Sequence, residues 1–321
     1  MQYVLGIDGG GTKCDAVVMD EDGTVLGWGR GGSVHGLYVG AEAVAQSVQD
    51  AVTGAVAVHQ PPLAKIAGTW LHQGLSEWLG QPVGMEQLVS AGEAEMGYAM
   101  ALTTHGLLVL SGTGSFVHGL TSDGRRAHEG GQGPIIADEG SAHHIGILGI
   151  RAAFRAGYSE ARRTSLAEAI PVALGVANLQ EVFHLLYVER IGRSQIAAAA
   201  RTVNEAAEAG DAVAAQVLRR AADELGELVI EVIHRLDFRD SQEKLVATGS
   251  VAQGSTIFWQ RLCEIALAEA PGLQPVQPRI RPVMGACLLA LRSLGIEWTD
   301  ALVDRILATQ SPYLSRLTNR P

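Results

Sequence analysis

The hydrophobic pattern of the first thirty residues predicts three short strands joined by tight turns. Residues 4–8 and 15–19 are mainly apolar, and three consecutive glycines lie between them. Asp22 and Gly23 then precede a third such segment, residues 24–28. Short apolar segments bounded by glycine, with an Asp-Gly pair between two of them, are typical of strands joined as hairpins. The chain is therefore predicted to begin with paired strands whose first turn is rich in glycine.

Helical spacing of Ala, Val and Leu characterises much of the rest of the chain. Helices are predicted over residues 41–58, 71–79, 93–104, 194–209, 211–236, 256–270 and 282–291, with a break at Gly210. Residues 64–68 read as a strand, and residues 244–255 read as a strand, a glycine turn and the start of a helix. This mixture of strands and helices predicts an α/β fold.

The opening pattern returns in the middle of the chain. Residues 106–127, GLLVLSGTGSFVHGLTSDGRRA, again give an apolar strand, a glycine-rich turn, a strand and an Asp-Gly hairpin. Two ordinary hairpins in a mixed sheet would explain each copy separately. Because the glycine-rich turn precedes the second strand in both copies, we favour an internal duplication.

Length, charge and cysteine content narrow the class of protein. A chain of 321 residues with 47% hydrophobic residues can fill two domains, and its net charge of −10 argues against a nucleic-acid partner. No apolar run approaches the roughly 18 residues of a membrane span, and the N-terminus lacks the pattern of a secretory leader. The odd number and wide spacing of Cys14, Cys263 and Cys287 fit a reduced compartment. A cytoplasmic protein is predicted.

The first glycine turn matches neither of two familiar phosphate-binding motifs. Thr12 and Lys13 follow the glycines but lead into a strand, whereas the Walker motif opens a helix. The dinucleotide fingerprint fails because Cys14 replaces its third glycine. A turn of exposed N–H groups between two strands remains, and it can bind an anion. Since Asp8 lies beside it, a cation such as Mg²⁺ is expected between carboxylate and phosphate.

The second glycine turn repeats this arrangement without the carboxylate. Residues 111–115, SGTGS, offer a second anion site with three hydroxyl groups. Residues 247–255, ATGSVAQGS, place small residues at a strand end, where a flat base could approach the backbone. Any one such turn is more often structural, but three in this order predict a nucleotide site.

These motifs resemble those of the amino-sugar kinases of the N-acetylglucosamine kinase type and the related activator ATPases. Both belong to the superfamily of hexokinases, actin and heat-shock chaperone ATPases. Residues 8–12 and 110–115 match the two phosphate motifs, and residues 246–254 match the adenosine motif. The motif order is kept over nearly the whole chain. The resemblance implies an α/β fold of two domains, with a duplicated ribonuclease H-like core and an interdomain cleft.

The resemblance also implies cofactors, domain limits and binding residues. It implies ATP, Mg²⁺ held by Asp8, and a homodimer. The expected N-terminal domain comprises residues 1–105 plus 300–321, and the C-terminal domain comprises residues 106–299. The implied nucleotide-binding residues are Gly9, Gly10, Gly11, Thr12, Lys13, Gly112, Thr113, Gly114, Ser115, Gly249 and Ser250.

The sugar pocket is implied by residues 130–142, GGQGPIIADEGSA, and by the segment after the third strand. Asp138 could instead cap the helix that follows it. Three positions depart from the family: His35 replaces an asparagine, Gln132 a tryptophan and Ala137 a glycine. These departures bear on the choice of sugar more than on phosphoryl transfer. The implied substrate-binding residues are Ser33, His35, Glu93, Gly130, Gly131 and Asp138.

Glu93 takes the place of the family's catalytic aspartate when positions are counted back from the second phosphate motif. No aspartate occurs between Asp50 and Asp123 to replace it. The extra methylene of Glu93 moves its carboxylate outward by about 1–1.5 Å. Two interpretations remain: Glu93 is the catalytic base, or it caps its helix while Glu95 is solvated.

The predicted function is an ATP-dependent kinase of an amino sugar such as N-acetylglucosamine or glucosamine, and the resemblance implies that the 6-hydroxyl is the acceptor. A catalytically weak protein that senses nucleotide or sugar is the alternative of a different class. An activator-type ATPase is a third, but those proteins hold an iron–sulfur cluster with cysteines. No cysteine occurs here between Cys14 and Cys263.

Overall fold

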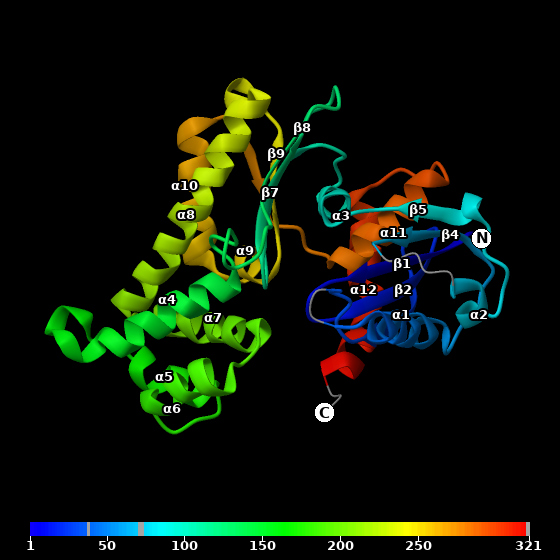
Figure 1. Ribbon diagram of the computed structural model, residues 1–321. Coiled ribbons are helices and arrows are strands. Elements are labelled where there is room, and N and C mark those ends of the chain that lie inside the picture. Colours follow the sequence, from blue (N-terminus) through cyan, green and yellow to red (C-terminus); the bar gives the residue numbers. More distant parts are fainter. Residues whose placement is uncertain (37–38, 70–73, 319–321) are drawn as a thin grey trace. The chain divides into compact units, whose positions relative to one another are not determined.

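The computed structural model describes residues 1–36, 39–69 and 74–318. The chain divides into two compact units, one formed by Met1–Thr104 with Pro278–Pro321 and the other by His105–Gln277 (Figure 1). Each unit contains a five-stranded mixed sheet with helices packed on it. The predicted α/β class with a repeated core is confirmed. Of the helix expected at 71–79, positions 71–73 lie outside the described residues, and α2 covers Leu75–Leu79.

The sheet of the first unit is centred on β1 (Tyr3–Gly9), in the order β3-β2-β1-β4-β5. β2 (Cys14–Asp20) is antiparallel to β1 and to β3 (Val25–Gly31). β4 (Leu63–Gly68) and β5 (Leu88–Ser90) extend the other side in parallel. Because Gly9 pairs with Cys14, the glycine turn closes one end of the β1–β2 hairpin.

The helix α1 (Ala41–Val56) packs closely against β2 and β3. Three alternate residues of β3 are glycines, and they lie on one face of the strand. A Cβ atom added at Gly27, Gly29 or Gly31 would lie 1.8–1.9 Å from a carbonyl oxygen of α1. The glycines therefore let the helix backbone rest directly on the strand.

The helix α11 (Pro282–Ser293) packs against β1, β4 and α3 (Glu93–Met100) of the first unit. A Cβ atom at Gly6 would lie 2.6 Å from the Val283 carbonyl oxygen, and one at Gly285 would lie 2.3 Å from that of Met96. Residues 278–299, which include α11, thus belong to the first unit, whereas they were predicted to lie in the C-terminal domain. α12 (Asp300–Thr318) also belongs to this unit and packs on β3.

The sheet of the second unit repeats the topology of the first. β6 (Gly106–Ser111) occupies the place of β1 in the order β10-β9-β6-β7-β8. β7 (Ser115–Leu120) and β8 (Arg126–Gly130) form antiparallel pairs, and β9 (Lys244–Thr248) and β10 (Gln274–Val276) are parallel neighbours. Two hairpin-connected strands on one side and two parallel strands on the other recur strand for strand. This correspondence supports the internal duplication.

Two long helices, α8 (Ala212–Leu236) and α10 (Thr256–Glu269), lie side by side in the second unit (Figure 1). Gly210 has a φ of +97°, which ends α7, and Asp211 then caps α8, so the predicted break is confirmed. Among helices of the described residues, none is long and apolar enough to cross a membrane. The remaining α-helices of this unit are α4 (Ala142–Arg155), α5 (Leu166–Ala173), α6 (Leu179–His184), α7 (Arg193–Glu208) and α9 (Ser250–Gly254).

Candidate functional site

The first glycine turn joins β1 to β2 and is open on its outer side. The N–H of Gly10 donates to the Lys13 carbonyl oxygen at 2.9 Å, and that of Gly9 donates to Thr69 Oγ1 at 3.2 Å. A Cβ atom at Gly10 or Gly11 would meet no atom within 4 Å, and neither residue has a positive φ. Backbone strain therefore does not explain these glycines. The open space leaves room for a ligand to approach the backbone.

Asp8 lies at the end of β1, directly before this turn. Burial raises the pKa of its carboxyl group to about 7, and the charges of Glu93 and Asp15 contribute in the same direction while Lys13 opposes them. A cation at this carboxylate would relieve the unfavourable charge. Asp8 therefore has the electrostatic environment expected of a metal-binding carboxylate.

Glu93 is the first residue of α3, in the same unit as Asp8. Its side chain is exposed, yet desolvation by the surrounding protein raises the pKa of its carboxyl group. Glu95, not Glu93, closes the capping box, because its Oε2 accepts the N–H of Gly92 at 3.0 Å. The helix-capping interpretation therefore describes Glu95 and leaves the Glu93 carboxyl group for another role.

Lys13 is paired within the first unit. Its Nζ lies 2.8 Å from Asp15 Oδ2, and Arg30 binds both oxygens of the same carboxylate at 2.7 and 3.0 Å. Burial alone would raise the pKa of Asp15, but the hydrogen bonds from Arg30 and the charge of Lys13 lower it below its usual value. The structure thus gives Lys13, a predicted nucleotide ligand, a role in an ion-pair network that was not predicted for it.

The second glycine turn is hydrogen-bonded to the segment that precedes α4. Ser111 Oγ donates to the Gly140 carbonyl oxygen at 2.6 Å, and Ser115 Oγ donates to that of Glu139 at 2.6 Å. The Gly112 carbonyl oxygen accepts the N–H of Ala142 at 2.8 Å. Two of the three hydroxyl groups expected to face a phosphate are therefore engaged as donors to the protein itself.

Asp138 lies beneath this turn, buried and with a left-handed φ of +72°. Its carboxylate forms an ion pair with Arg193 and accepts the N–H of Ser115 at 3.3 Å. Ser141, not Asp138, caps α4 by accepting the N–H of His144 at 3.1 Å. The helix-capping alternative for Asp138 is therefore wrong. Arg193 was missed from the sequence because nothing in its neighbourhood marks it.

Gly249 brings the predicted adenosine motif against the second glycine turn. It connects β9 to α9 with a φ of +85°, and a Cβ atom there would lie 2.3 Å from the Ser111 carbonyl oxygen. Ser250 is the first residue of α9. Two segments predicted to bind the nucleotide, separated by more than a hundred residues, thus meet at one end of the second sheet.

The predicted sugar-binding residues fall into two groups, one in each unit. Ser33 and His35 follow β3, where the Ser33 Oγ accepts the N–H of His35 at 3.3 Å. The residue between them, Val34, donates its N–H to the Gly10 carbonyl oxygen at 3.1 Å, so this segment lies beside the first turn. In the other unit, Gly130 and Gly131 have φ values of +82° and +79° at the end of β8. Because a positive φ favours glycine, the backbone conformation is by itself a sufficient reason for glycine at both positions.

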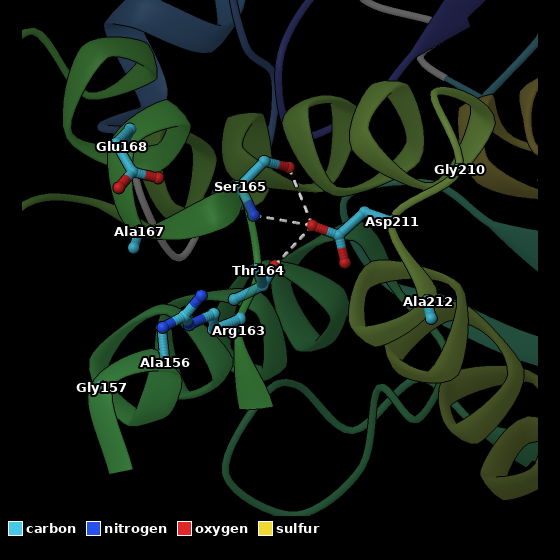
Figure 2. A pocket seen from close by; sticks show the side chains of 10 residues that line it. All are labelled: Ala156, Gly157, Arg163, Thr164, Ser165, Ala167, Glu168, Gly210, Asp211 and Ala212. Atoms are coloured by element: carbon cyan, nitrogen blue, oxygen red, sulfur yellow. Dashed lines mark hydrogen bonds between the residues drawn. The ribbon is translucent and has the colours of Figure 1, made fainter. Parts of the chain in front are cut away.

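A separate hollow of the second unit contains none of the predicted site residues (Figure 2). Figure 2 shows Asp211 pointing at Thr164 and Ser165, whose hydroxyl groups donate to Asp211 Oδ2 at 2.7 and 2.8 Å. The other oxygen of Asp211 caps α8. Its carboxylate thus links the start of α5 to the start of α8, so the polar groups lining the hollow serve to hold these two helices together.

The cysteines do not form a cluster site. Cys14 and Cys287 are buried, and burial raises the pKa of each thiol to about 12. Cys263 is partly buried, with its pKa raised to about 11, first by burial. Within the described residues, no group of three or more His, Cys, Asp or Glu could hold a metal ion. Mg²⁺ bound to nucleotide phosphates needs only one or two protein carboxylates, so Asp8 remains a suitable ligand.

Comparison with known proteins relates most of the chain to a family of ATPases and to kinases of amino sugars. Residues 5–290 match the family described as the BadF/BadG/BcrA/BcrD ATPase family. The N-acetylmuramic acid/N-acetylglucosamine kinase of Clostridium acetobutylicum is 26% identical, over 90% of this chain and 98% of its own. The N-acetyl-D-glucosamine kinase of Dictyostelium discoideum is 25% identical, over 91% and 98%. A solved structure from Chromobacterium violaceum, described as a candidate N-acetylglucosamine kinase, is 25% identical, over 90% and 99%, with a TM-score of 0.65.

Proposed function

This chain belongs to the BadF/BadG/BcrA/BcrD ATPase family, and on that premise we propose that it is an ATP-dependent kinase of amino sugars. Its substrate is N-acetylglucosamine, glucosamine or a close derivative, and the 6-hydroxyl receives the phosphoryl group. The observation that carries this proposal is the Clostridium acetobutylicum relative, a kinase of two N-acetylated amino sugars that aligns over 90% of this chain.

The two glycine turns are the proposed phosphate-binding elements. The first turn, Gly9 to Lys13, has open space in front of Gly10 and Gly11, where a phosphate can approach the backbone. The second turn, Gly112 to Ser115, is held at the end of β6 against Gly249. Backbone N–H groups at such turns stabilise phosphate oxygens without a side chain. Gly249 and Ser250 are the proposed contacts of the adenosine.

Glu93 is the proposed catalytic base. Its carboxylate accepts the proton of the sugar hydroxyl while the oxygen attacks the γ-phosphorus of ATP. The bond from that phosphorus to the bridging oxygen breaks, and ADP leaves with the bonding electrons. A carboxyl group whose pKa is raised toward neutrality is better suited to this proton transfer than one of ordinary acidity.

Asp8 is the proposed ligand of Mg²⁺. Its raised pKa shows that the bare carboxylate is unfavourable where it lies, which fits a group that normally faces a cation. Mg²⁺ supplies charge neutralisation on the phosphate oxygens. Asp8 itself would hold the Mg²⁺ ion at the end of β1, and it takes no proton from the sugar.

Ser33, His35, Gly130, Gly131 and Asp138 are the proposed sugar contacts, together with Glu93. His35 can donate to or accept from a hydroxyl, as an amide does, but it presents a ring of different shape. The proposal therefore names a class of sugar. We also propose a homodimer, as the sequence resemblance implies, which sedimentation of the purified protein tests. A cytoplasmic location is proposed from the cysteine content.

A catalytically weak sensor is the second candidate, and the length of the Glu93 side chain favours it. A carboxylate displaced by about 1 Å can lower a rate around 100-fold. ADP release with each sugar and without sugar, measured beside binding of the same sugars, separates the two. Sugar-dependent turnover supports the kinase, whereas binding of sugar and nucleotide without turnover supports the sensor.

A further inference from the structure

Arg193 joins the second glycine turn to Asp138. Its guanidinium forms an ion pair with one oxygen of Asp138, and its Nη2 also donates to the Thr113 carbonyl oxygen at 3.3 Å. The N–H of Ser115 donates to the other oxygen of Asp138 at 3.3 Å. A single Arg–Asp pair therefore contacts the backbone of the turn at two positions.

This ion pair is withdrawn from solvent. The side chain of Asp138 is 3% exposed and that of Arg193 is 16% exposed. Removing one partner of a buried pair leaves the other charge without compensation, so the two residues depend on each other. A surface pair would not fix its surroundings in this way.

Gly114 fits against the pair with no room for a side chain. A Cβ atom there would lie 2.5 Å from Arg193 Nη2 and 3.0 Å from Asp138 Oδ1. The glycine of the phosphate motif is thus explained at this position by the arginine beneath it. The conformation of the turn depends on where the guanidinium lies.

We propose that Arg193 is a positioning residue for the kinase reaction: it holds the second glycine turn in the shape that binds the nucleotide phosphates, through Asp138 and Thr113. This inference rests on the proposed function, because it assigns the turn to a nucleotide. Arg193 begins α7, whose first turn is closed by Gln195 accepting the N–H of Gly192 at 2.9 Å. The helix therefore fixes the backbone from which the guanidinium extends.

The test compares Arg193→Met, Asp138→Asn and the double variant with the native chain. Affinity for the Mg²⁺ complex of a non-hydrolysable ATP analogue is measured by calorimetry, and stability by thermal unfolding. Arg193→Met is expected to lower the Tm and to weaken affinity about 10- to 100-fold, because the turn is misplaced. The double variant removes both charges, so its Tm should recover, while its affinity should remain at least about 10-fold weaker. Should Arg193→Met not fold, the double variant carries the test.

The control is Arg201→Met on the same helix, since Arg201 is 84% exposed and pairs only loosely with Glu205 at 3.7 Å. It should bind the analogue like the native chain. Native affinity in the double variant would overturn the proposal, since the pair would then serve stability alone. Binding of the analogue can be measured whether or not the chain phosphorylates a sugar. If the native chain binds the analogue but phosphorylates no sugar, the proposed kinase activity is wrong, and the affinities of the Arg193 variants still test the role of Arg193.

Discussion

Glu93 and Asp8 interact electrostatically in the first unit: the charge of Glu93 adds to burial in raising the pKa of the Asp8 carboxyl group to about 7. Two nearby carboxyl groups in unlike surroundings can take different roles in one reaction. Asp8 lies at the mouth of the first glycine turn, and Glu93 is exposed at the start of α3. The account therefore assigns the metal to Asp8 and the proton to Glu93.

Replacing Glu93 with Gln tests the base directly. The amide keeps the shape of the side chain but cannot accept the sugar proton, so turnover should fall by about 100-fold or more. Affinity for ATP should stay within a few-fold, because Glu93 is proposed to contact the sugar and not the nucleotide. Steady-state ADP release and nucleotide titration measure the two effects.

Glu95→Gln is the matched control. Glutamine can still close the capping box at Gly92, so helix α3 and the activity should be retained. Native turnover in Glu93→Gln would remove Glu93 as the base. An increase of activity in Glu93→Asp would identify the native chain as a weakened kinase and favour the sensor.

Asp8→Asn should change the pH dependence of stability. The carboxyl pKa of Asp8 is about 7 in the folded protein against an ordinary 3.8, so the folded state keeps a proton that the unfolded state has lost in this interval. Native stability is therefore penalised increasingly as the pH rises from about 4 to 7. Removing the charge should stabilise the metal-free protein by up to about 4 kcal/mol at pH 8 and by little at pH 4.

Urea unfolding in the presence of a chelator measures this difference from pH 5 to pH 8. A gain that grows with pH agrees with the account. If the substitution changed stability equally at every pH, or if the gain in stability shrank as the pH rises, the pKa of Asp8 would not be raised as described. The same variant should lose turnover, because the proposed metal ligand is gone.

Gly10 and Gly114 should respond differently to substitution. A Cβ atom added at Gly114 would lie 2.5 Å from Arg193 Nη2, whereas one added at Gly10 would meet no atom within 4 Å. Gly114→Ala should therefore lower both stability and nucleotide affinity. Gly10→Val should fold with a native Tm and still lose affinity, because its side chain occupies the space left for phosphate. Thermal unfolding and nucleotide titration check both; unchanged affinity in Gly10→Val would remove the first turn from the site.

Local patterns in the sequence predicted the strands, the glycine turns and the repeated unit. Alternating apolar segments and Asp-Gly hairpins depend on neighbouring residues, so β1–β2 and β6–β7 were placed correctly. The same locality explains why Gly210 was recognised as a break between two helices. Helix ends were less accurate, because α3 stops at Met100 rather than at residue 104.

Contacts between distant residues were not visible in the sequence. Arg193 and Asp138 are 55 positions apart, and only the folded chain brings α7 against the second turn. The hydroxyl groups of Ser111 and Ser115 were expected to face a ligand, but in the folded chain they donate to carbonyl oxygens of the protein. The ion pair of Lys13 and Asp15 is a different case, because these residues are neighbours in the sequence. Residues two apart on an extended segment share a face, so this pairing could have been anticipated.

The central claim is that the chain transfers a phosphoryl group from ATP to an amino sugar. The measurement that tests it most directly is ADP release with Mg²⁺ and ATP across glucosamine, N-acetylglucosamine, N-acetylmuramate, its anhydro form and glucose. The account predicts turnover that depends on an amino sugar, that exceeds turnover with glucose, and that yields the sugar 6-phosphate. ADP release at the same rate with and without sugar, or no release with any of the five sugars, would contradict it.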